Sequence, residues 1–253
     1  MKAYIAGSNI SEAVRAWAQG EGFEAAHCCD VGGVAVLIGP SDFQVDCDRE
    51  GWLNDQGYDR IFESCFVCAT LSAESRTEVV RELFQRIGPR EYCASINPLQ
   101  NASCYGELFA FAKKISEREI LSLFDLGCGP GTILDSHVSR CGLNITGFDL
   151  AEDNLKAASA RGLNVIDENG LSEYGPSQFD AVICAYVMHY ESMSSIFVAR
   201  VFDLIKPGGV WVSNFHKRKG LENFLALIDS MGSKEIILRE SQFGPLVAVV
   251  RVD

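Results

Sequence analysis

Three glycines at alternate positions, with an acid just before them, are the residues of this sequence whose spacing points most directly to chemistry. Gly127, Gly129 and Gly131 follow the apolar run of residues 121–126, which contains Asp125. Because glycine has no side chain, such a turn brings the backbone against a bound ligand, and a following helix offers it free N–H groups. The spacing matches neither the Gly-Lys-Ser/Thr ending of a phosphate-binding loop nor the Gly-x-Gly-x-x-Gly dinucleotide fingerprint. The pattern therefore predicts a strand, a turn and a helix around a ligand of another kind.

The stretch resembles motif I of the class I S-adenosylmethionine-dependent methyltransferases, in which the glycine turn passes under the amino-acid end of the cofactor. Four later stretches resemble the family's next landmarks in the same order: residues 143–150, 163–168, 178–186 and 204–212. The resemblance implies a doubly wound, mostly parallel α/β sheet of seven strands in the second part of the chain. It also implies S-adenosyl-L-methionine as the cofactor and S-adenosyl-L-homocysteine as the product.

The resemblance further implies which residues hold the cofactor. Asp125 helps to hold the amino-acid end, Asp149 binds the ribose hydroxyls, and Asp167 ends the strand that contacts adenine. A carboxylate suits the ribose because it can accept hydrogen bonds from two vicinal hydroxyls at once. Tyr105, on a helix expected over 103–114, occupies a place where the family contacts the cofactor or the substrate, although aromatic residues at helical spacing are more often core. The other cofactor-binding residues that the resemblance implies are Gly127, Cys128, Gly129, Gly131, Leu150 and Ala185.

Methyl transfer from a sulfonium needs an aligned nucleophile, and a base helps when the acceptor is a hydroxyl or an ammonium group. Of the four histidines, His189 follows the fourth strand of the resemblance and His216 follows the fifth. Both belong to the carboxyl edge of the sheet, where open α/β sheets bind ligands, and histidine titrates near neutral pH. We take His189 as the first candidate for a base and His216 as the second, with helix capping or pocket lining as the alternative role. His27 and His137 fall in a strand and a helix away from that edge.

Composition narrows the class of partner and the cell compartment. The formal net charge of −12 argues against binding to nucleic acid or to an anionic membrane. The one basic run, residues 216–219, is interpreted as a solvated loop. Cys65 and Cys68 lack a second pair at metal-binding spacing, and the ten cysteines are scattered among apolar residues, so we expect reduced thiols, no metal and a cytoplasmic protein. No apolar run reaches the roughly 20 residues of a membrane span, which predicts a soluble protein.

Two domains are expected, an N-terminal α/β subdomain over residues 1–100 and the methyltransferase-like domain over residues 101–253. For the first domain we expect strands at 1–7, 23–28, 34–38 and 61–70, with a turn at Gly32 and Gly33 and a loop over 42–59. We also expect two helices. The first is capped by Asn9 and ends at Gly20 or Gly22, and the second covers 75–87 and is stopped by Gly88 and Pro89. The segment from 89 to 102 is expected to be irregular. The subdomain lacks a glycine-rich phosphate loop, and we interpret it as a lid, a specificity element or a dimerisation module.

In the second domain we expect helices at about 130–140, 152–161, 192–205 and 219–231. Two apolar runs at the end of the chain, 235–239 and 246–251, suggest an antiparallel pair. Strands that alternate with helices and end in such a pair predict a doubly wound sheet with one reversed edge strand.

Together these features predict an enzyme that methylates an oxygen or a nitrogen of a small molecule. Residues 213–216, after the fifth strand, are not the Asn/Asp-Pro-Pro-Tyr signature of the enzymes that methylate bases or glutamine. The alternatives that stay open are a protein or RNA methyltransferase, a non-catalytic cofactor-binding partner or regulatory protein, and aminopropyl transfer.

Overall fold

The computed structural model describes residues 1–25, 34–232 and 234–252. It divides the chain into two compact units, Met1–Ser95 and Ile96–Asp253. The division falls a few residues before the boundary expected at 100, so the second unit opens with a long helix, α4 (Pro98–Ile115). Asn97 caps this helix by accepting hydrogen bonds from two N–H groups of its first turn.

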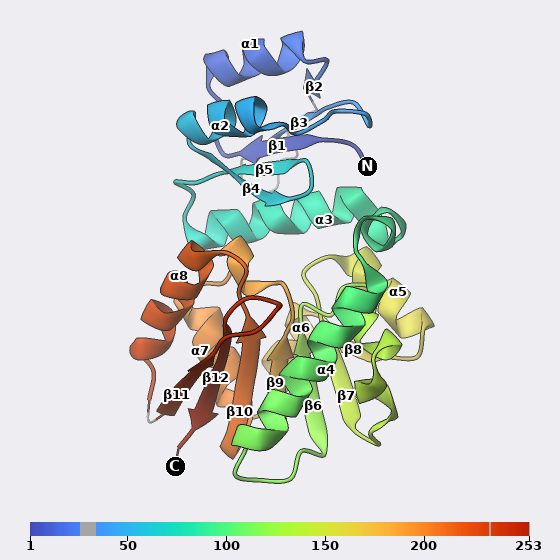
Figure 1. The fold of residues 1–253 in the computed structure, drawn as a ribbon, viewed down its shortest axis with the longest axis vertical. Helices are drawn as coiled ribbons and strands as arrows, with labels where there is room; N and C mark the ends of the chain where they lie inside the picture. Colours follow the sequence, from blue (N-terminus) through green and yellow to red (C-terminus); the bar gives the residue numbers. More distant parts are fainter. Residues whose placement is uncertain (26–33, 233, 253) are drawn as a thin grey trace. The chain divides into compact units, whose positions relative to one another are not determined.

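The first unit is built on a five-stranded sheet with the order β2-β3-β1-β5-β4 (Figure 1). Strands β1 and β5 pair in parallel, and the other neighbouring pairs are antiparallel. In chain order the elements are β1 (Tyr4–Gly7), α1 (Glu12–Gly20), β2 (Glu24–Ala25), β3 (Ala35–Ile38), α2 (Cys47–Asp55), β4 (Tyr58–Phe62), β5 (Cys65–Cys68) and α3 (Ala73–Ser95).

Several expectations for the first unit are wrong. Ser11, not Asn9, caps α1, since its hydroxyl accepts a hydrogen bond from the N–H group of Val14 at 3.3 Å. The segment expected as a loop over 42–59 contains α2, whose sequence is mostly polar and lacks an apolar periodicity. The single strand expected over 61–70 is instead a hairpin of β4 and β5, which turns at Glu63 with a φ of 43°.

The label α3 covers two helices that meet at Gly88. Gly88 has a φ of 69° and a ψ of 161°, which are not helical, so the first helix ends there, as expected, and a second helix begins directly after it. Pro89 fits the first turn of the restarted helix because that position needs no N–H donor. The expected irregular segment after residue 89 is therefore helical up to Ser95. His27, the turn at Gly32 and Gly33, and the end of the strand expected over 23–28 lie outside the described residues.

The second unit contains a seven-stranded sheet with the order β11-β12-β10-β9-β6-β7-β8. After α4, its elements are β6 (Ser122–Leu126), the 3₁₀ helices η1 (Thr132–Asp135) and η2 (His137–Arg140), β7 (Asn144–Phe148), α5 (Glu152–Ala160), β8 (Asn164–Ile166), α6 (Glu168–Glu173), β9 (Phe179–Cys184), η3 (Met188–Tyr190), α7 (Ser195–Asp203), β10 (Ile205–Asn214), α8 (Arg218–Asp229), β11 (Lys234–Arg239) and β12 (Leu246–Arg251). The predicted mostly parallel seven-stranded α/β sheet is confirmed. Strand β12 runs antiparallel to both β10 and β11, so the reversed strand lies inside the sheet and not at its edge.

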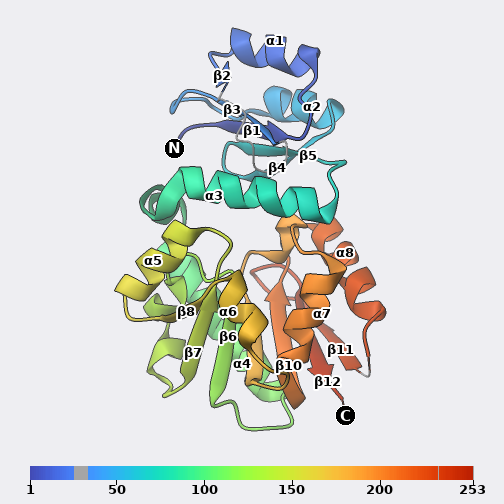
Figure 2. The same ribbon diagram turned by 180° about the vertical axis from the view of Figure 1, so that it is seen from behind.

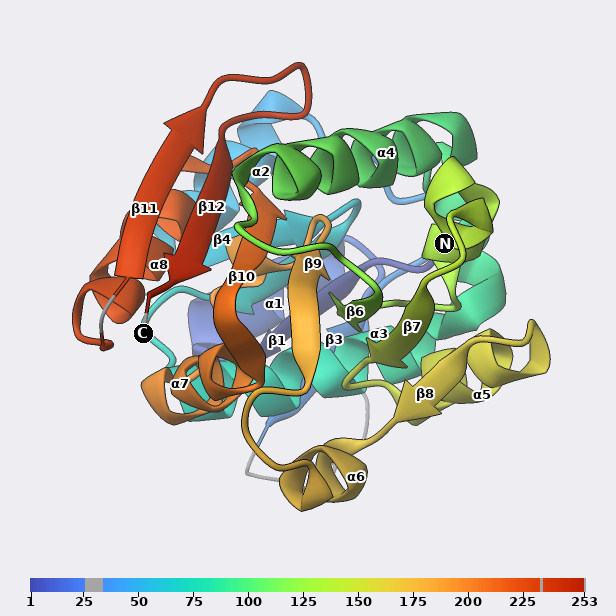
Figure 3. The same ribbon diagram turned by 90° about the horizontal axis from the view of Figure 1, so that it is seen from below.

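Helices cover both faces of this sheet. Figure 2 shows α6 and α7 in front of it, and Figure 3 shows α4 on the opposite side. One core, on the side of α4 and α5, includes Tyr105 and Leu123; the other, on the side of α6, α7 and α8, includes Phe124 and Trp211. Leu123 and Phe124 are consecutive residues of β6, whose side chains alternate between the two faces.

The segment after the glycine turn differs from the prediction. An α-helix was expected over 130–140, but the chain forms the two short 3₁₀ helices η1 and η2. Ser136 separates them, with an extended backbone and a hydroxyl that accepts a hydrogen bond from the N–H group of Val138 at 3.3 Å. A serine that bonds to the nearby backbone in this way competes with a continuous helix.

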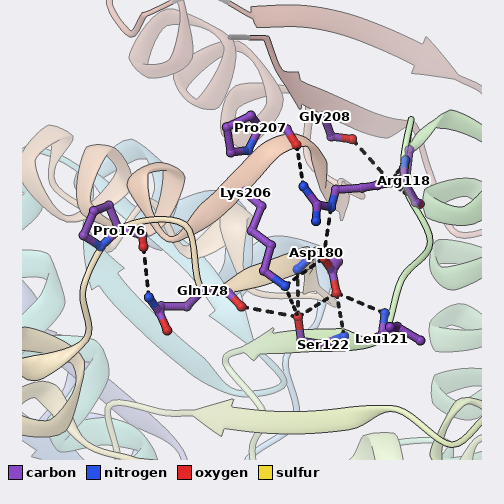
Figure 4. A network of polar contacts seen from close by, with 10 residues as sticks. Arg118, Leu121, Ser122, Pro176, Gln178, Asp180, Lys206, Pro207 and Gly208 are labelled. Atoms are coloured by element: carbon purple, nitrogen blue, oxygen red, sulfur yellow. Dashed lines mark hydrogen bonds and ion pairs between the residues drawn. The ribbon is translucent and has the colours of Figure 1, made fainter.

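The amino-terminal edge of the sheet is held by a polar network around Asp180 (Figure 4). Its carboxylate accepts hydrogen bonds from the N–H groups of Leu121 and Ser122 at 3.1 and 2.9 Å, and it pairs with Lys206 at 2.9 Å and Arg118 at 3.1 Å. Burial alone would raise the pKa of Asp180, but the hydrogen bonds from Lys206, Ser122 and the backbone outweigh burial and lower it to about 2. The network lies at the edge opposite to the glycine turn and joins β6, β9 and β10.

Candidate active site

The glycine turn has the backbone that its spacing predicts. Gly127, Gly129 and Gly131 have φ values of 77°, 53° and 82°, in the left-handed region that favours glycine. The N–H group of Gly127 donates to the carbonyl oxygen of Phe148 at 2.8 Å, which ties the turn to the carboxyl end of β7. A Cβ atom on Gly127 would lie 2.3 Å from the side chain of Val187. The turn therefore needs glycine both for its conformation and for its close approach to the segment after β9.

Two acids lie beside this turn, at the ends of neighbouring strands. Asp125 belongs to β6 and Asp149 follows β7, and the two strands pair in parallel. Both oxygens of Asp125 lie within hydrogen-bonding distance of the Tyr105 hydroxyl, at 3.1 and 3.3 Å. Asp149 accepts from the N–H group of Gly129 at 2.9 Å, so it also fixes the turn. The helix α4, the turn and two strands thus meet at these carboxylates.

The two carboxylates have no positively charged partner in the described part of the chain. Among the described residues, neither Asp125 nor Asp149 forms an ion pair or a hydrogen bond with a Lys, Arg or His side chain. Burial raises the pKa of Asp125 to about 8; the Tyr105 hydrogen bond opposes this shift, and the charge of Asp149 adds to it. Burial also raises the pKa of Asp149, against three hydrogen bonds that lower it. A cationic ligand would stabilise the ionised acids, and S-adenosylmethionine carries a sulfonium and an ammonium group, so the residues fit the cofactor that the sequence implies.

A second group of side chains lies at the ends of β9 and β10. Tyr186 has a φ of 59°, which is rare for a residue with a side chain and often marks functional sites. Its N–H group donates to Oδ1 of Asn214 at 2.8 Å, and the Asn214 amide donates to the carbonyl oxygen of Phe243 at 3.1 Å. The ring of His216 lies 5.9 Å from the Tyr186 ring, centroid to centroid. Partial burial, and then the charge of Lys217, lower the pKa of His216, which favours its neutral form.

Sequence analysis did not single out Tyr186 and Asn214. They are far apart in the chain, and the parallel pairing of β9 with β10 brings them together. The only signal in the sequence is that Asn214 stands at the end of the fifth strand. Its stretch, residues 213–216, was compared with the Asn/Asp-Pro-Pro-Tyr signature and does not match it.

The remaining predicted cofactor residues are placed as follows. Ala185 is buried directly after β9, and Leu150 is half-buried directly after Asp149. Cys128 is fully buried in the turn, and burial raises the pKa of its thiol, so it is not a reactive nucleophile. Asp167 is exposed and caps α6, since its Oδ1 accepts from the N–H group of Gly170 at 2.8 Å.

Of the histidines, only His216 has a described side chain at the carboxyl edge of the sheet. His189 lies in η3, at this edge, and its side chain is outside the described part of the structure. His137 packs over α4, where a Cβ atom on Gly106 would lie 2.7 Å from the imidazole. The structural role expected for His137 stays a prediction.

The described residues contain no cluster of three or more His, Cys, Asp or Glu side chains suited to a metal ion. No helix among them has the length and apolar character to cross a membrane.

Residues 124–213 match the model of a protein family described as a methyltransferase domain. The chain is 29% identical over 184 residues to a ubiquinone biosynthesis O-methyltransferase of Psychrobacter arcticus, a match that covers 66% of this chain and 69% of that protein. It is 31% identical over 142 residues to the protein of the same name from Bordetella pertussis, with 53% and 55% covered.

A solved structure is also similar to this chain. It is Haemonchus contortus phosphoethanolamine N-methyltransferase 2 in complex with S-adenosyl-L-methionine, with a TM-score of 0.50 and 13% identity, over 75% of this chain and 62% of that one. At this identity the likeness shows the fold that the two proteins share.

Proposed function

We propose that this protein, which belongs to the class I S-adenosylmethionine-dependent methyltransferases, methylates an oxygen atom of a small hydroxylated molecule. The observation that carries the proposal is a pair of acids, buried Asp125 and half-buried Asp149, which have no Lys, Arg or His partner among the described residues and lie beside the glycine turn. The choice of oxygen over nitrogen is supported by the similar O-methyltransferases of Psychrobacter arcticus and Bordetella pertussis.

One group of residues in the site would bind the cofactor, and another would bind the acceptor. The turn and the two acids would hold S-adenosylmethionine, which supplies a methyl group already activated on a sulfonium. The remaining task of the protein is to align the acceptor and to exclude water. Tyr186 and His216 lie at the carboxyl ends of the next two strands, where an acceptor can be reached from the same edge of the sheet.

His216 is our candidate for the base. Its lowered pKa leaves the imidazole neutral near pH 7, so a ring nitrogen can accept the proton of an acceptor hydroxyl as the methyl group is transferred. His189, in η3, is the other candidate at this edge. We expect His216→Gln to lower the turnover of a hydroxylated acceptor while the affinity for S-adenosylhomocysteine stays unchanged.

The proposal is tested by incubating the protein with labelled S-adenosylmethionine and a panel of phenols, catechols and primary amines. Methylation of phenols or catechols, reduced by Asp149→Ala, is the expected result. Methylation of the amines alone would show that the acceptor atom is nitrogen and not oxygen. Transfer to neither class, in a protein that binds the cofactor, would contradict a small-molecule enzyme and favour a macromolecular acceptor or a regulatory role.

The role of the first unit, Met1–Ser95, stays a prediction: a lid, a specificity element or a homodimerisation module. We expect the full chain to form a dimer if the unit serves the last role, and light scattering coupled to size-exclusion chromatography measures this directly.

A further inference from the structure

Asp149 is held by three hydrogen bonds, and one of the donors is a side chain. The Oδ1 atom accepts from the N–H group of Ala151 at 2.9 Å and from Nδ2 of Asn154 at 3.1 Å. The Oδ2 atom accepts from the N–H group of Gly129 at 2.9 Å. Two donors on Oδ1 use its two lone pairs, whereas Oδ2 keeps an acceptor direction open. The amide of Asn154 therefore helps to decide which oxygen of Asp149 is available to a ligand.

Asn154 makes this bond at a cost to the fold. Its side chain lies on the first turn of α5 and is 3% exposed. Its own Oδ1 atom is buried and has no hydrogen-bond partner in the described structure. A buried acceptor without a donor destabilises a fold, and such groups in native proteins call for a reason. Leucine has almost the same shape as asparagine and would fill this position without an unmet hydrogen bond.

We propose that Asn154 is a positioning residue for the cofactor: its amide fixes Oδ1 of Asp149 and so keeps Oδ2 available to a ribose hydroxyl. This inference rests on the proposed cofactor site. It predicts that stability and binding respond in opposite directions to the same substitution, because the amide serves the ligand and not the fold. A purely structural asparagine would lose stability when it is replaced.

The test is Asn154→Leu in the full chain, measured by calorimetric titration with S-adenosylhomocysteine and by thermal unfolding. We expect the affinity to fall about tenfold, the scale of a lost hydrogen bond to a charged group, and the unfolding midpoint not to fall. Without the amide the pKa of Asp149 should rise further, so the pH at which binding is half lost should move upward. Asn154→Asp places a second carboxylate beside Asp149 and should weaken binding more than Asn154→Leu at pH 8.

Asn164→Leu is the matched control. Asn164 also donates through Nδ2, to the hydroxyl of Thr146 at 3.0 Å, but at the start of β8, away from the two acids. We expect it to leave the affinity for S-adenosylhomocysteine unchanged. In an Asp149→Ala background, Asn154→Leu should have no further effect on binding, because its route to the ligand is gone.

Three outcomes would overturn the inference. They are unchanged binding by Asn154→Leu, a fall of several degrees in its unfolding midpoint, and a loss of affinity that persists in the Asp149→Ala background. If the wild-type protein binds no S-adenosylhomocysteine, the cofactor site itself is refuted, and the inference fails with it.

Discussion

At the scale of single residues, Asp125 links cofactor binding to pH. Its pKa of about 8 in the cofactor-free protein means that the carboxyl group is mostly protonated at pH 6 and 7. A cationic ligand needs the carboxylate, so binding below pH 8 must release a proton. We expect the affinity for S-adenosylhomocysteine to rise between pH 6 and pH 8, by at most about tenfold per pH unit.

Calorimetric titration at several pH values measures this dependence. Asp125→Asn should bind more weakly at pH 8 and should show a flatter pH profile, which separates Asp125 from Asp149. Equal slopes in the two proteins would refute the role of Asp125. Without ligand, the stability of the fold has the opposite pH dependence. Between about pH 4 and pH 8 the folded state holds a proton on Asp125 that the unfolded state has released, so the free energy of unfolding falls as the pH rises through this window.

Asn214 is the second residue whose role can be isolated. Asn214→Ala would leave the partly buried N–H group of Tyr186 without its acceptor, in a backbone conformation that is already strained. We expect a loss of about 1–3 kcal/mol in the free energy of unfolding, measured by urea denaturation. Asn223→Ala, which removes an exposed hydrogen bond to Glu191, is the control and should be nearly neutral. A loss no larger than that of the control would show that Asn214 does not hold Tyr186 in place.

At the scale of elements, the turn after β6 allows a paired test of glycine. Gly127 and Gly142 have nearly the same φ, 77° and 72°. A Cβ atom on Gly127 would meet Val187 at 2.3 Å, whereas a Cβ atom on Gly142 would meet nothing within 4 Å. Gly142→Ala should cost about 1 kcal/mol of backbone strain and leave binding intact. Gly127→Ala should cost more and should weaken S-adenosylhomocysteine binding by displacing the segment after β9; equal effects would show that contact with Val187 is unimportant.

The junction of β6, β9 and β10 depends on the charge of Asp180. Its folded pKa of about 2 lies below the ordinary value of 3.8, so the stabilisation is complete above about pH 5 and is lost as the pH falls toward 2. We expect Asp180→Asn to lower the free energy of unfolding by about 2 kcal/mol at pH 7 and by less at pH 3. Urea denaturation at both pH values checks this. A penalty that is the same at pH 3 and pH 7 would contradict the electrostatic explanation.

The elements differ in how far the sequence predicts them. The strands of the second unit stand out because they are buried on both faces and read as apolar runs bounded by turns. Helix α2 was missed because its buried surface is small and its residues are mostly polar. The α-helix expected after the glycine turn was wrong because Ser136 satisfies the backbone locally, an effect that apolar periodicity does not register.

At the scale of the whole molecule, the family resemblance supplied the cofactor but not the network that supports it. Asp125, Asp149 and the glycines could be named from the family resemblance, because each belongs to a motif that is contiguous in the sequence. The contacts of Asn154 with Asp149 and of Asn214 with Tyr186 could not, because they depend on where helix α5 and strand β10 place single amides. The methyl acceptor also could not be predicted from spacing, because side chains from several elements recognise it.

The central claim is that this protein binds S-adenosylmethionine through Asp149, and calorimetric titration tests it most directly. S-adenosylmethionine and S-adenosylhomocysteine are titrated into the wild-type protein, into Asp149→Ala, and into Asp153→Ala, a nearby acid on the surface of α5, as the control. We predict that the wild type and the control bind both ligands and that Asp149→Ala binds more weakly by about 1–3 kcal/mol. Absence of binding to the wild type, or equal affinities in all three proteins, would contradict the account.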